Sequence, residues 1–400
     1  TPSSTSGLNT NWQDEIYTTG LIRSYDMAAS GGSETSNFRI SGGYFEREGI
    51  IIETGFQRYS FRANSDFTFG KLKLGQNMSI NFNKQNPDPT GIGDRSLLEH
   101  AIKAAPYLSV YNSNNLGGFQ GPNSAGDGQD AENPVRILKH GNALNNTFAL
   151  VGNIFAEYDI IEGLKFKSQV GLDYYKGTSD RFIPSYNDDS LGGTHQQAFA
   201  SITKNNSAGQ TIIFTNSLTY NTTFGDAHNF EALLLSEKFE SQGTSLNANS
   251  RNSVSDEIDE LSNEDSSLQS TSFEYNRLGF LGRLNYNYDD KYIAAVSLRR
   301  DASAKFGANN RWGWFSSYAL GWNIAKENFM ENTSVSTLKL RGSLGYSGND
   351  RIDNYLYSAT LVNNFLYPIA GSNAVGTTAF GLENPDLKWE ETRQLNVGVD

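Results

Sequence analysis

Apolar and polar side chains alternate along long stretches of this chain, and no other feature of the sequence restricts the fold as strongly. In the segment 71–83, KLKLGQNMSINFN, one face carries lysine, asparagine and serine, and the other carries Leu72, Leu74, Met78, Ile80 and Phe82. The same division recurs in 164–175 and in 338–346. A period of two is that of a β-strand, whose successive side chains point to opposite faces of a sheet. The sequence therefore predicts an all-β protein whose sheet has one apolar and one polar face.

The alternation predicts thirteen strands, most of them longer than the five or six residues typical of soluble sheets. A tilted strand needs about nine to eleven residues to cross a bilayer. Strands of that length favour an antiparallel transmembrane β-barrel as the fold class. The predicted strands span roughly 23–31, 37–46, 57–69, 71–83, 147–160, 164–176, 211–224, 228–240, 276–289, 291–301, 312–325, 338–347 and 393–400.

The connections between these strands alternate between short turns and long loops. The short turns lie at 31–36, around Gly70, at 160–163, at 224–228 and at 289–290, with a medium one at 326–337. Outer-membrane barrels have short periplasmic turns and long extracellular loops, whereas a soluble sandwich has no reason to sort its loops by length. We therefore expect extracellular loops at 47–56, 84–146, 177–210, 241–275, 302–311 and 348–392.

Charge and composition exclude several classes of function. The formal net charge is −12, which argues against nucleic acid as a partner because nucleic-acid binders need a basic surface. The chain has no cysteine, so it forms no disulfide and no thiolate metal site. Its start, TPSSTSGLNT, does not resemble a signal peptide, and no apolar run is long enough for a membrane helix. The chain is therefore either soluble or enters a membrane as strands.

Thirteen is an odd number for a single-chain bacterial barrel, and it would leave two unpaired strand edges in lipid. The sequence also ends on LNVGVD, in the middle of a predicted strand. We therefore expect these 400 residues to be a segment of a longer polypeptide.

No constellation of catalytic residues stands out, and we predict no enzyme. The four histidines lie far apart without metal-binding spacing, and there is no G-x-S-x-G elbow or complete phosphate-binding loop. The acidic run DEIDELSNED at 256–265 offers weak calcium ligands in Asp256, Asp259 and Glu260, although its spacing does not match an EF-hand loop. The competing interpretation of this run is a solvated surface loop. Apart from calcium, we expect no cofactor.

Within the longest loop, the segment SLLEHAIKAAP at 96–106 predicts a short helix. Leu97, Leu98, Ala101 and Ile102 recur at helical spacing, and Pro106 marks the end.

Six stretches carry a resemblance to a known family. They are NWQDEIYTTG (11–20), SGGYFEREGII (41–51), YNRLGFLGRLNYNYDDKY (275–292), RRDASAKFGANNRWGWFSSYALGW (299–322), LRGSLGYSGND (340–350) and NPDLKWEETRQLNVGVD (384–400). Together they resemble signatures of the SusC/RagA-like TonB-dependent transporters of the Bacteroidota outer membrane. The resemblance covers nearly the whole chain.

The resemblance implies a 22-stranded barrel that is filled by an N-terminal plug and capped by a SusD-like surface lipoprotein. Residues 1–400 would then form one barrel domain of approximately strands 2–14, without the plug. The implied function is active import of an oligosaccharide or an oligopeptide across the outer membrane of a Gram-negative cell. TonB, with ExbB and ExbD, would energise import through the missing N-terminal region, and outer-membrane lipid would surround the barrel. The alternative is a soluble or surface-attached glycan-binding protein or glycosidase, which would need a pair of carboxylates.

Two sets of residues are candidates for the site. Aromatic rings in the long loops can stack on sugar rings or peptide side chains, and the candidates for substrate binding are Tyr107, Tyr111, Phe119, Tyr186, Trp312, Trp314, Tyr355 and Phe365. Arg299, Arg300 and Asp301 lie where one strand meets the loop 302–311. We expect these three to pin that loop to the barrel wall or to the plug, with contact to cargo as the alternative.

Overall fold

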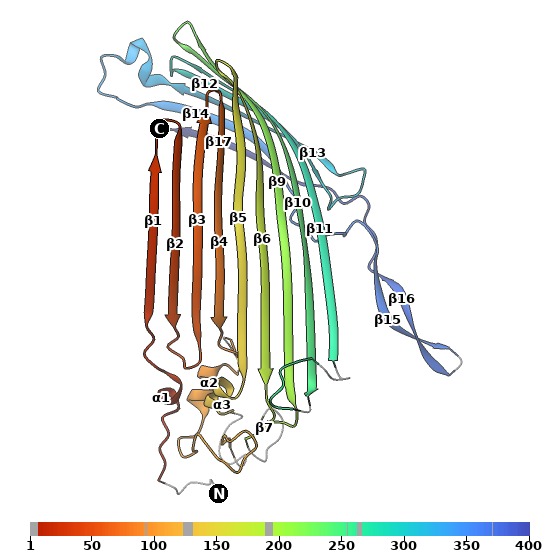
Figure 1. The fold of residues 1–400 in the computed structure, drawn as a ribbon. Coiled ribbons are helices and arrows are strands. Elements are labelled where there is room, and N and C mark those ends of the chain that lie inside the picture. The colour runs from red at the N-terminus through yellow and green to blue at the C-terminus, as the bar shows by residue number, and fades with distance from the viewer. Residues whose placement is uncertain are drawn as a thin grey trace.

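The computed structural model describes residues 7–91, 93, 95–122, 131–188, 195–253, 255–261, 266–369 and 371–400. Within this part of the chain, thirteen strands form one antiparallel sheet, in the order β1-β2-β3-β4-β5-β6-β9-β10-β11-β12-β13-β14-β17. Strands that are neighbours in the sheet therefore follow one another along the sequence, and the sheet curves as a single wall (Figure 1). The prediction of an all-β antiparallel fold is confirmed.

The main sheet consists of β1 (Ile22–Gly32), β2 (Ser36–Glu48), β3 (Gly55–Phe69), β4 (Leu72–Asn86), β5 (Asn142–Ile161), β6 (Leu164–Ile183), β9 (Ala200–Phe224), β10 (His228–Ser253), β11 (Ser266–Tyr288), β12 (Tyr292–Ser303), β13 (Trp312–Asn323), β14 (Lys339–Asn349) and β17 (Glu390–Val399). Two small hairpins, which the alternation did not predict, consist of β7 (Tyr186–Asn187) with β8 (Gln196–Gln197) and β15 (Thr360–Ile369) with β16 (Ser372–Phe380). The helical elements are α1 (Trp12–Ile16), α2 (Leu97–Lys103), α3 (Pro134–Lys139) and the 3-10 turns η3 (Ile324–Lys326) and η4 (Asn328–Met330).

Short turns lie at one end of the sheet and long connections at the other (Figure 1). At the turn between β11 and β12, Asp289 and Asp290 both have positive φ values, of 50° and 52°. Gly225 and Asp226 show the same pattern between β9 and β10, with φ values of 58° and 55°. Two consecutive residues of this kind form the tight turn whose twist suits a β-hairpin. The sorting of connections by length agrees with the prediction, and the extracellular position of the long ones stays a prediction.

Four strands extend well beyond their predicted ends. β6 continues to Ile183 and β9 begins at Ala200, so most of the loop predicted at 177–210 is strand. β10 continues to Ser253 and β11 begins at Ser266, which corrects the loop predicted at 241–275 in the same way. These extensions are rich in serine, asparagine and threonine and lack an apolar face, so they show no alternation. Backbone hydrogen bonds continue the ladder regardless of side-chain polarity.

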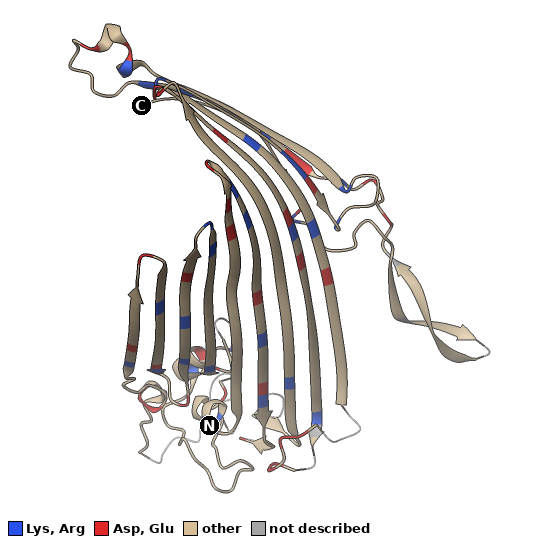
Figure 2. Ribbon diagram, turned by 45° about the horizontal axis from the view of Figure 1, so that its top comes forward, with Lys and Arg blue, Asp and Glu red and all other residues tan. Residues whose placement is uncertain are grey.

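One face of the sheet is apolar and exposed. On this face, Leu234 of β10, Leu298 of β12 and Leu320 of β13 are 62%, 48% and 70% exposed. On the other face, Glu231 accepts hydrogen bonds of 2.9 Å from both Arg283 and Asn285. Figure 2 shows acidic and basic residues interspersed along the strands. A sheet that is apolar on one side and polar on the other is typical of a membrane barrel wall.

None of the helices in the described part of the chain has the length and apolar character that a membrane crossing needs. The helix predicted at 96–106 is confirmed as α2, and its N-cap Ser96 accepts a hydrogen bond from the backbone N–H of Glu99.

Candidate functional site

Three short helices pack together at the long-loop end of the sheet and form what we call the rim cluster, made of α1, α2, α3 and the segments 104–122 and 131–141 (Figure 1). Trp12 of α1 donates a hydrogen bond of 2.9 Å from Nε1 to the carbonyl of Ala105. The backbone N–H of Ile52 donates to the carbonyl of Ile16, which ties α1 to the β2–β3 connection. The buried apolar core of the cluster consists of Trp12, Ile16, Leu97, Ala101, Leu108, Val110, Phe119, Val135 and Leu138.

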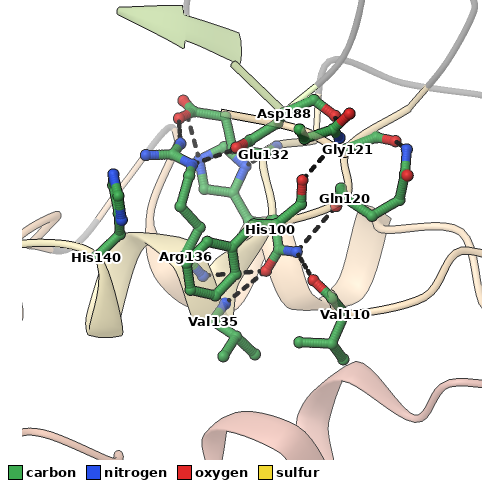
Figure 3. A network of polar contacts seen from close by, with 12 residues as sticks. His100, Val110, Gln120, Gly121, Glu132, Val135, Arg136, His140 and Asp188 are labelled. Atoms are coloured by element: carbon green, nitrogen blue, oxygen red, sulfur yellow. Dashed lines mark hydrogen bonds and ion pairs between the residues drawn. The ribbon is translucent and has the colours of Figure 1, made fainter. Parts of the chain in front are cut away.

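Asn133 positions α3 within this cluster. Its side-chain oxygen accepts from the backbone N–H groups of Val135 and Arg136 at 3.0 and 3.1 Å, so it is the N-cap of the helix. Its amide nitrogen donates to the carbonyls of Val110 and Gln120, both at 2.8 Å (Figure 3). One buried side chain therefore starts the helix and fixes it to the loop that precedes it.

A buried ion-pair network lies beside α3 (Figure 3). Arg136 is 4% exposed, and its Nε donates to Oδ2 of Asp188 at 2.6 Å. A second guanidinium nitrogen of Arg136 bonds to Glu132, which also pairs with Arg95 at 2.5 Å. The guanidinium carbon of Arg136 lies 3.8 Å from the centre of the Tyr186 ring. Two arginines are thus balanced by two carboxylates, as burial of charge requires.

His100 belongs to the same network and is 2% exposed. Its Nδ1 accepts a hydrogen bond of 3.1 Å from the backbone N–H of Glu132, which is the arrangement of a neutral imidazole with its proton on Nε2. Burial lowers the pKa of His100 below its ordinary value, and the nearby carboxylate of Glu132 opposes that effect.

The lowered pKa of His100 predicts that the rim cluster weakens in mild acid. As the pH falls below about 6.5, the unfolded cluster takes up a proton before the folded cluster does. The stability that neutral His100 gives to the folded rim cluster is therefore fully present above that pH. It is lost as the pH falls toward the lower pKa that His100 has in the folded state. Hydrogen exchange of α2 should accelerate between pH 7.5 and pH 5. His100→Asn, which keeps an acceptor near the Nδ1 position, should flatten this dependence, and an unchanged pH profile in that variant would contradict the assignment.

A pocket of about 220 Å³ lies between the rim cluster and the ends of β4, β5 and β6. Arg95, His100, Glu132 and Arg136 form one side of its lining. Arg181 at the end of β6 and Glu53 in the β2–β3 connection also line it, and both are exposed.

Within the described part of the chain, neither Arg181 nor Glu53 has an ion-pair partner. Arg181 shares its face of β6 with Lys167, Gln169 and Asp173, so it lies on the polar side of the sheet. The pocket can therefore offer one guanidinium and one carboxylate to a ligand that approaches from the polar side.

Four of the predicted substrate-binding aromatics lie in or against the rim cluster. Phe119 is 5.4 Å from Tyr111 and 5.7 Å from His140, between ring centres, and His140 is 6.1 Å from Tyr186. Phe119 and Tyr186 are buried, so their faces already contact protein, whereas Tyr111 is 55% exposed. Tyr107 packs against the apolar core of the cluster. Of these four, Tyr111 presents the most ring surface to solvent.

The other four aromatics lie elsewhere. Trp312 and Trp314 belong to β13, on its apolar face. The hydroxyl of Tyr355 contacts backbone atoms of Glu274 at 3.3 Å, and Phe365 lies on β15, in the hairpin that projects from the sheet (Figure 1). The structure therefore does not gather the eight rings into one surface, and their contact with substrate stays a prediction.

Arg299, Arg300 and Asp301 separate onto two faces of β12. Arg299 donates from Nε to both carboxylate oxygens of Asp301, at 2.9 and 2.7 Å, and a further nitrogen lies 3.4 Å from Glu237 of β10. Asp301 is 6% exposed. Arg300 instead faces the apolar side, where it lies against Trp312 and Trp314. The contacts of Arg299 and Asp301 therefore link the end of β12 to the wall, and Arg300 takes no part in them.

The calcium candidates are not brought together. Asp256 accepts hydrogen bonds from the backbone N–H and the hydroxyl of Ser185, at 2.7 and 2.6 Å, and Glu260 forms an ion pair with Lys204 at 3.0 Å. Asp259 is exposed, and residues 262–265 of the acidic run lie outside the described residues. No three acidic or histidine side chains of the described residues form a group suited to a metal ion.

The ion-pair network was not found from the sequence. Part of it carried a signal, because Asn133 followed by Pro134 is a common helix start, and Glu132 and Arg136 have the spacing of a helical pair. Nothing in the sequence connects Arg136 with Asp188, which lies 52 positions further along the chain.

Comparison with known proteins identifies the family. The family described as "TonB dependent receptor-like, beta-barrel" matches residues 91–400. The TonB-dependent receptor P3 of Formosa agariphila is 33% identical over 98% of this chain and 39% of its own length. The TonB-dependent receptor SusC of Bacteroides thetaiotaomicron is 27% identical over 100% of this chain and 41% of its own length. This chain thus spans about two fifths of the length of these relatives.

The fold agrees with these sequence matches. The structure of "the RagAB peptide importer in the 'open-open' state" superimposes with a TM-score of 0.83 and 25% identity, over 100% of this chain and 44% of that one. A second RagAB structure, of the "peptide transporter", gives a TM-score of 0.81 and 26% identity over 98% of this chain and 43% of that one. These matches favour the barrel over the alternative of a soluble glycan-binding protein or glycosidase. The chain belongs to the β-barrel family of TonB-dependent receptors of the outer membrane, which are not enzymes, and it is of the SusC and RagA type.

Proposed function

We propose that the chain forms part of the wall and mouth of an importer that takes up an oligosaccharide or an oligopeptide with energy delivered through TonB. The observation that carries this proposal is the position of the pocket. It lies at the long-loop end, and Arg181 belongs to the polar face that would line the interior of a barrel. A ligand bound there would lie at the entrance to the passage that the barrel encloses.

The charges in the pocket favour a peptide over a glycan. Arg181 and Glu53 carry opposite charges and lack ion-pair partners among the described residues. A peptide offers a carboxylate to the first and an ammonium group to the second, whereas a neutral glycan leaves both without a charged partner. The RagAB relatives are described as peptide importers, which agrees with this choice.

The same proposal includes partners that the chain would need. A SusD-like surface lipoprotein would cap the long-loop end and hold the substrate over the pocket. TonB, with ExbB and ExbD, would act through a plug that the longer relatives have room for. The support for both partners is the likeness to SusC and to the RagAB importers.

Uptake by the full-length protein tests the role of the pocket. A charged hydrogen bond contributes about 1.5–3 kcal/mol, so Arg181→Gln should lower uptake of a labelled oligopeptide at limiting concentration by roughly tenfold to a hundredfold. Arg62→Gln is the matched control, because Arg62 is also an exposed arginine on the polar face but lies outside the pocket. Equal losses in both variants, or none in Arg181→Gln, would contradict the proposal. If Arg181→Gln lowers uptake of an oligosaccharide and not of a peptide, the result would support the importer function but contradict a peptide as its substrate.

A further inference from the structure

A groove of about 610 Å³ runs across the apolar face of the sheet, over strands β6 to β13. Its depth comes from Gly282 of β11, which pairs with Leu234 of β10 on one side and with Leu298 of β12 on the other. Because glycine has no side chain, a hollow remains between the two leucines. The exposed apolar side chains that line the groove include Phe166, Leu234, Phe280, Leu298 and Trp314.

Arg300 lies at one end of this groove, in register with Phe280 on one side and with Trp314 on the other. Its guanidinium carbon is 4.4 Å from the ring centre of Trp312 and 5.0 Å from that of Trp314. The indole faces hold the flat cation, while its N–H groups point outward in the guanidinium plane. Arg300 is exposed and, in the described part of the chain, forms no ion pair or hydrogen bond.

The depth of Arg300 in the membrane follows from its place on β12. Tyr292, at the short-turn end, stacks with Tyr288 and belongs to an aromatic boundary there. Arg300 lies eight residues further along the strand, which is roughly 26 Å of strand at about 3.3 Å per residue, or roughly 20 Å of height for a strand tilted by about 35–45°. The apolar band of an outer-membrane barrel is about 25 Å tall, and an exposed arginine costs little only near its edges. The backbone of Arg300 therefore lies near the long-loop edge of the apolar band, from which its long side chain can extend to the headgroup level.

A neighbouring cation differs from Arg300 in its surroundings. Lys238 of β10 lies on the same apolar face, two residues further toward the long-loop end, at the level of Ala302, but it forms an ion pair of 2.5 Å with Glu240. Arg300 has no such carboxylate among the described residues, so its charge is available to an external anion. An apolar hollow that ends at an available guanidinium is complementary to a molecule with an acyl chain and an anionic head.

We propose that this groove binds a lipid of the outer leaflet that carries a phosphate headgroup. One acyl chain lies over Gly282 between Leu234 and Leu298, and a phosphate oxygen pair accepts hydrogen bonds from Arg300. The two tryptophans keep the guanidinium at the height of the headgroups. This site lies on the lipid side of the wall, so it is independent of the pocket and of the imported substrate.

Native mass spectrometry of the full-length protein in detergent tests the site. The protein is mixed either with phosphorylated lipid A or with lipid A whose phosphates have been removed, and the retained lipid is measured. The wild type should retain the phosphorylated lipid at least tenfold better than the dephosphorylated one. Arg300→Gln should abolish this preference and Arg300→Lys should keep part of it. Gly282→Leu, which fills the hollow, should lower retention of both lipids by a similar factor.

Two matched variants serve as controls. Arg393→Gln removes another exposed arginine of the apolar face, on β17, and Gly342→Leu enlarges a glycine of the same face at which an added Cβ would meet the carbonyl of Asn396 at an ordinary contact distance of 3.8 Å. Both should bind lipid as the wild type does, and heat-modifiable migration on gels verifies that every barrel is folded. The proposal is overturned if the wild type does not distinguish the two lipids or if Arg300→Gln still distinguishes them. It is also overturned if Arg393→Gln loses as much of the preference for the phosphorylated lipid as Arg300→Gln does.

Discussion

Arg136→Ala will destabilise the rim cluster by about 3–5 kcal/mol, the usual result of removing one partner from a buried ion pair. The change leaves the carboxylate of Asp188, which is fully buried, without the cation that contacts it at 2.6 Å. Glu132 loses one of its two arginines, and the Tyr186 ring loses the guanidinium stacked on it. Hydrogen exchange of peptides that cover α3 should accelerate by about two to four orders of magnitude.

Arg95→Ala is the matched control for this experiment. Arg95 pairs with the same Glu132, but its side chain is 37% exposed, so water can replace much of what is lost. An exposed ion pair contributes about 0–1 kcal/mol, and exchange should change little. Equal effects of the two variants would show that burial of Arg136 is not what makes its ion pair important. The barrel itself should stay folded in both, because the network lies outside the main sheet.

Leu97→Ala will cost about 2–5 kcal/mol of rim-cluster stability, as is usual when a buried leucine is truncated and leaves a cavity. Leu97 is 1% exposed and belongs to the apolar core formed with Trp12 and Val135. Limited proteolysis of the full-length protein should cleave the β4–β5 connection much faster in this variant, since local unfolding exposes its backbone.

The adjacent residue gives a sharp control. Leu98 has the same side chain on the same helix but is 47% exposed, and Leu98→Ala should change stability by no more than about 0.5 kcal/mol. Faster cleavage in Leu98→Ala than in Leu97→Ala would contradict the packing of α2 described here. Unchanged cleavage in Leu97→Ala would show that the cluster does not depend on its apolar core.

The strands of the main sheet were predictable because each carries its own pattern. In β4, Leu74, Met78 and Phe82 alternate with polar residues, and the pleat of a strand turns that alternation into two faces. The pattern disappears where both faces are polar, as in Ser241–Ser250 of β10, so the true ends of the long strands were missed. The same period of two places Arg300 on the opposite face of β12 from its neighbours Arg299 and Asp301.

Local signals also explain what was found among the helices. The spacing of Leu97 with Ala101 and the stop at Pro106 predict α2, and Asn133 with Pro134 is a comparable local signal for α3. Which face of α2 is buried was not predictable, because Leu98 and Ile102 are as apolar as Leu97 yet lie exposed.

The sequence by itself determined the fold class, the approximate positions of the strands in the main sheet and the sorting of loops, because these depend on neighbours along the chain. Only the tertiary structure decided the candidate site. Arg136 meets Asp188 across 52 positions, and Arg181 at the end of β6 shares a pocket with Glu53 of the β2–β3 connection. These contacts depend on how the loops fold over the end of the sheet. A loop has no repeating sequence pattern from which its contact partner could be predicted. The pairing of Arg300 with two tryptophans across β12 and β13 likewise required the strand register, which the folded sheet supplies.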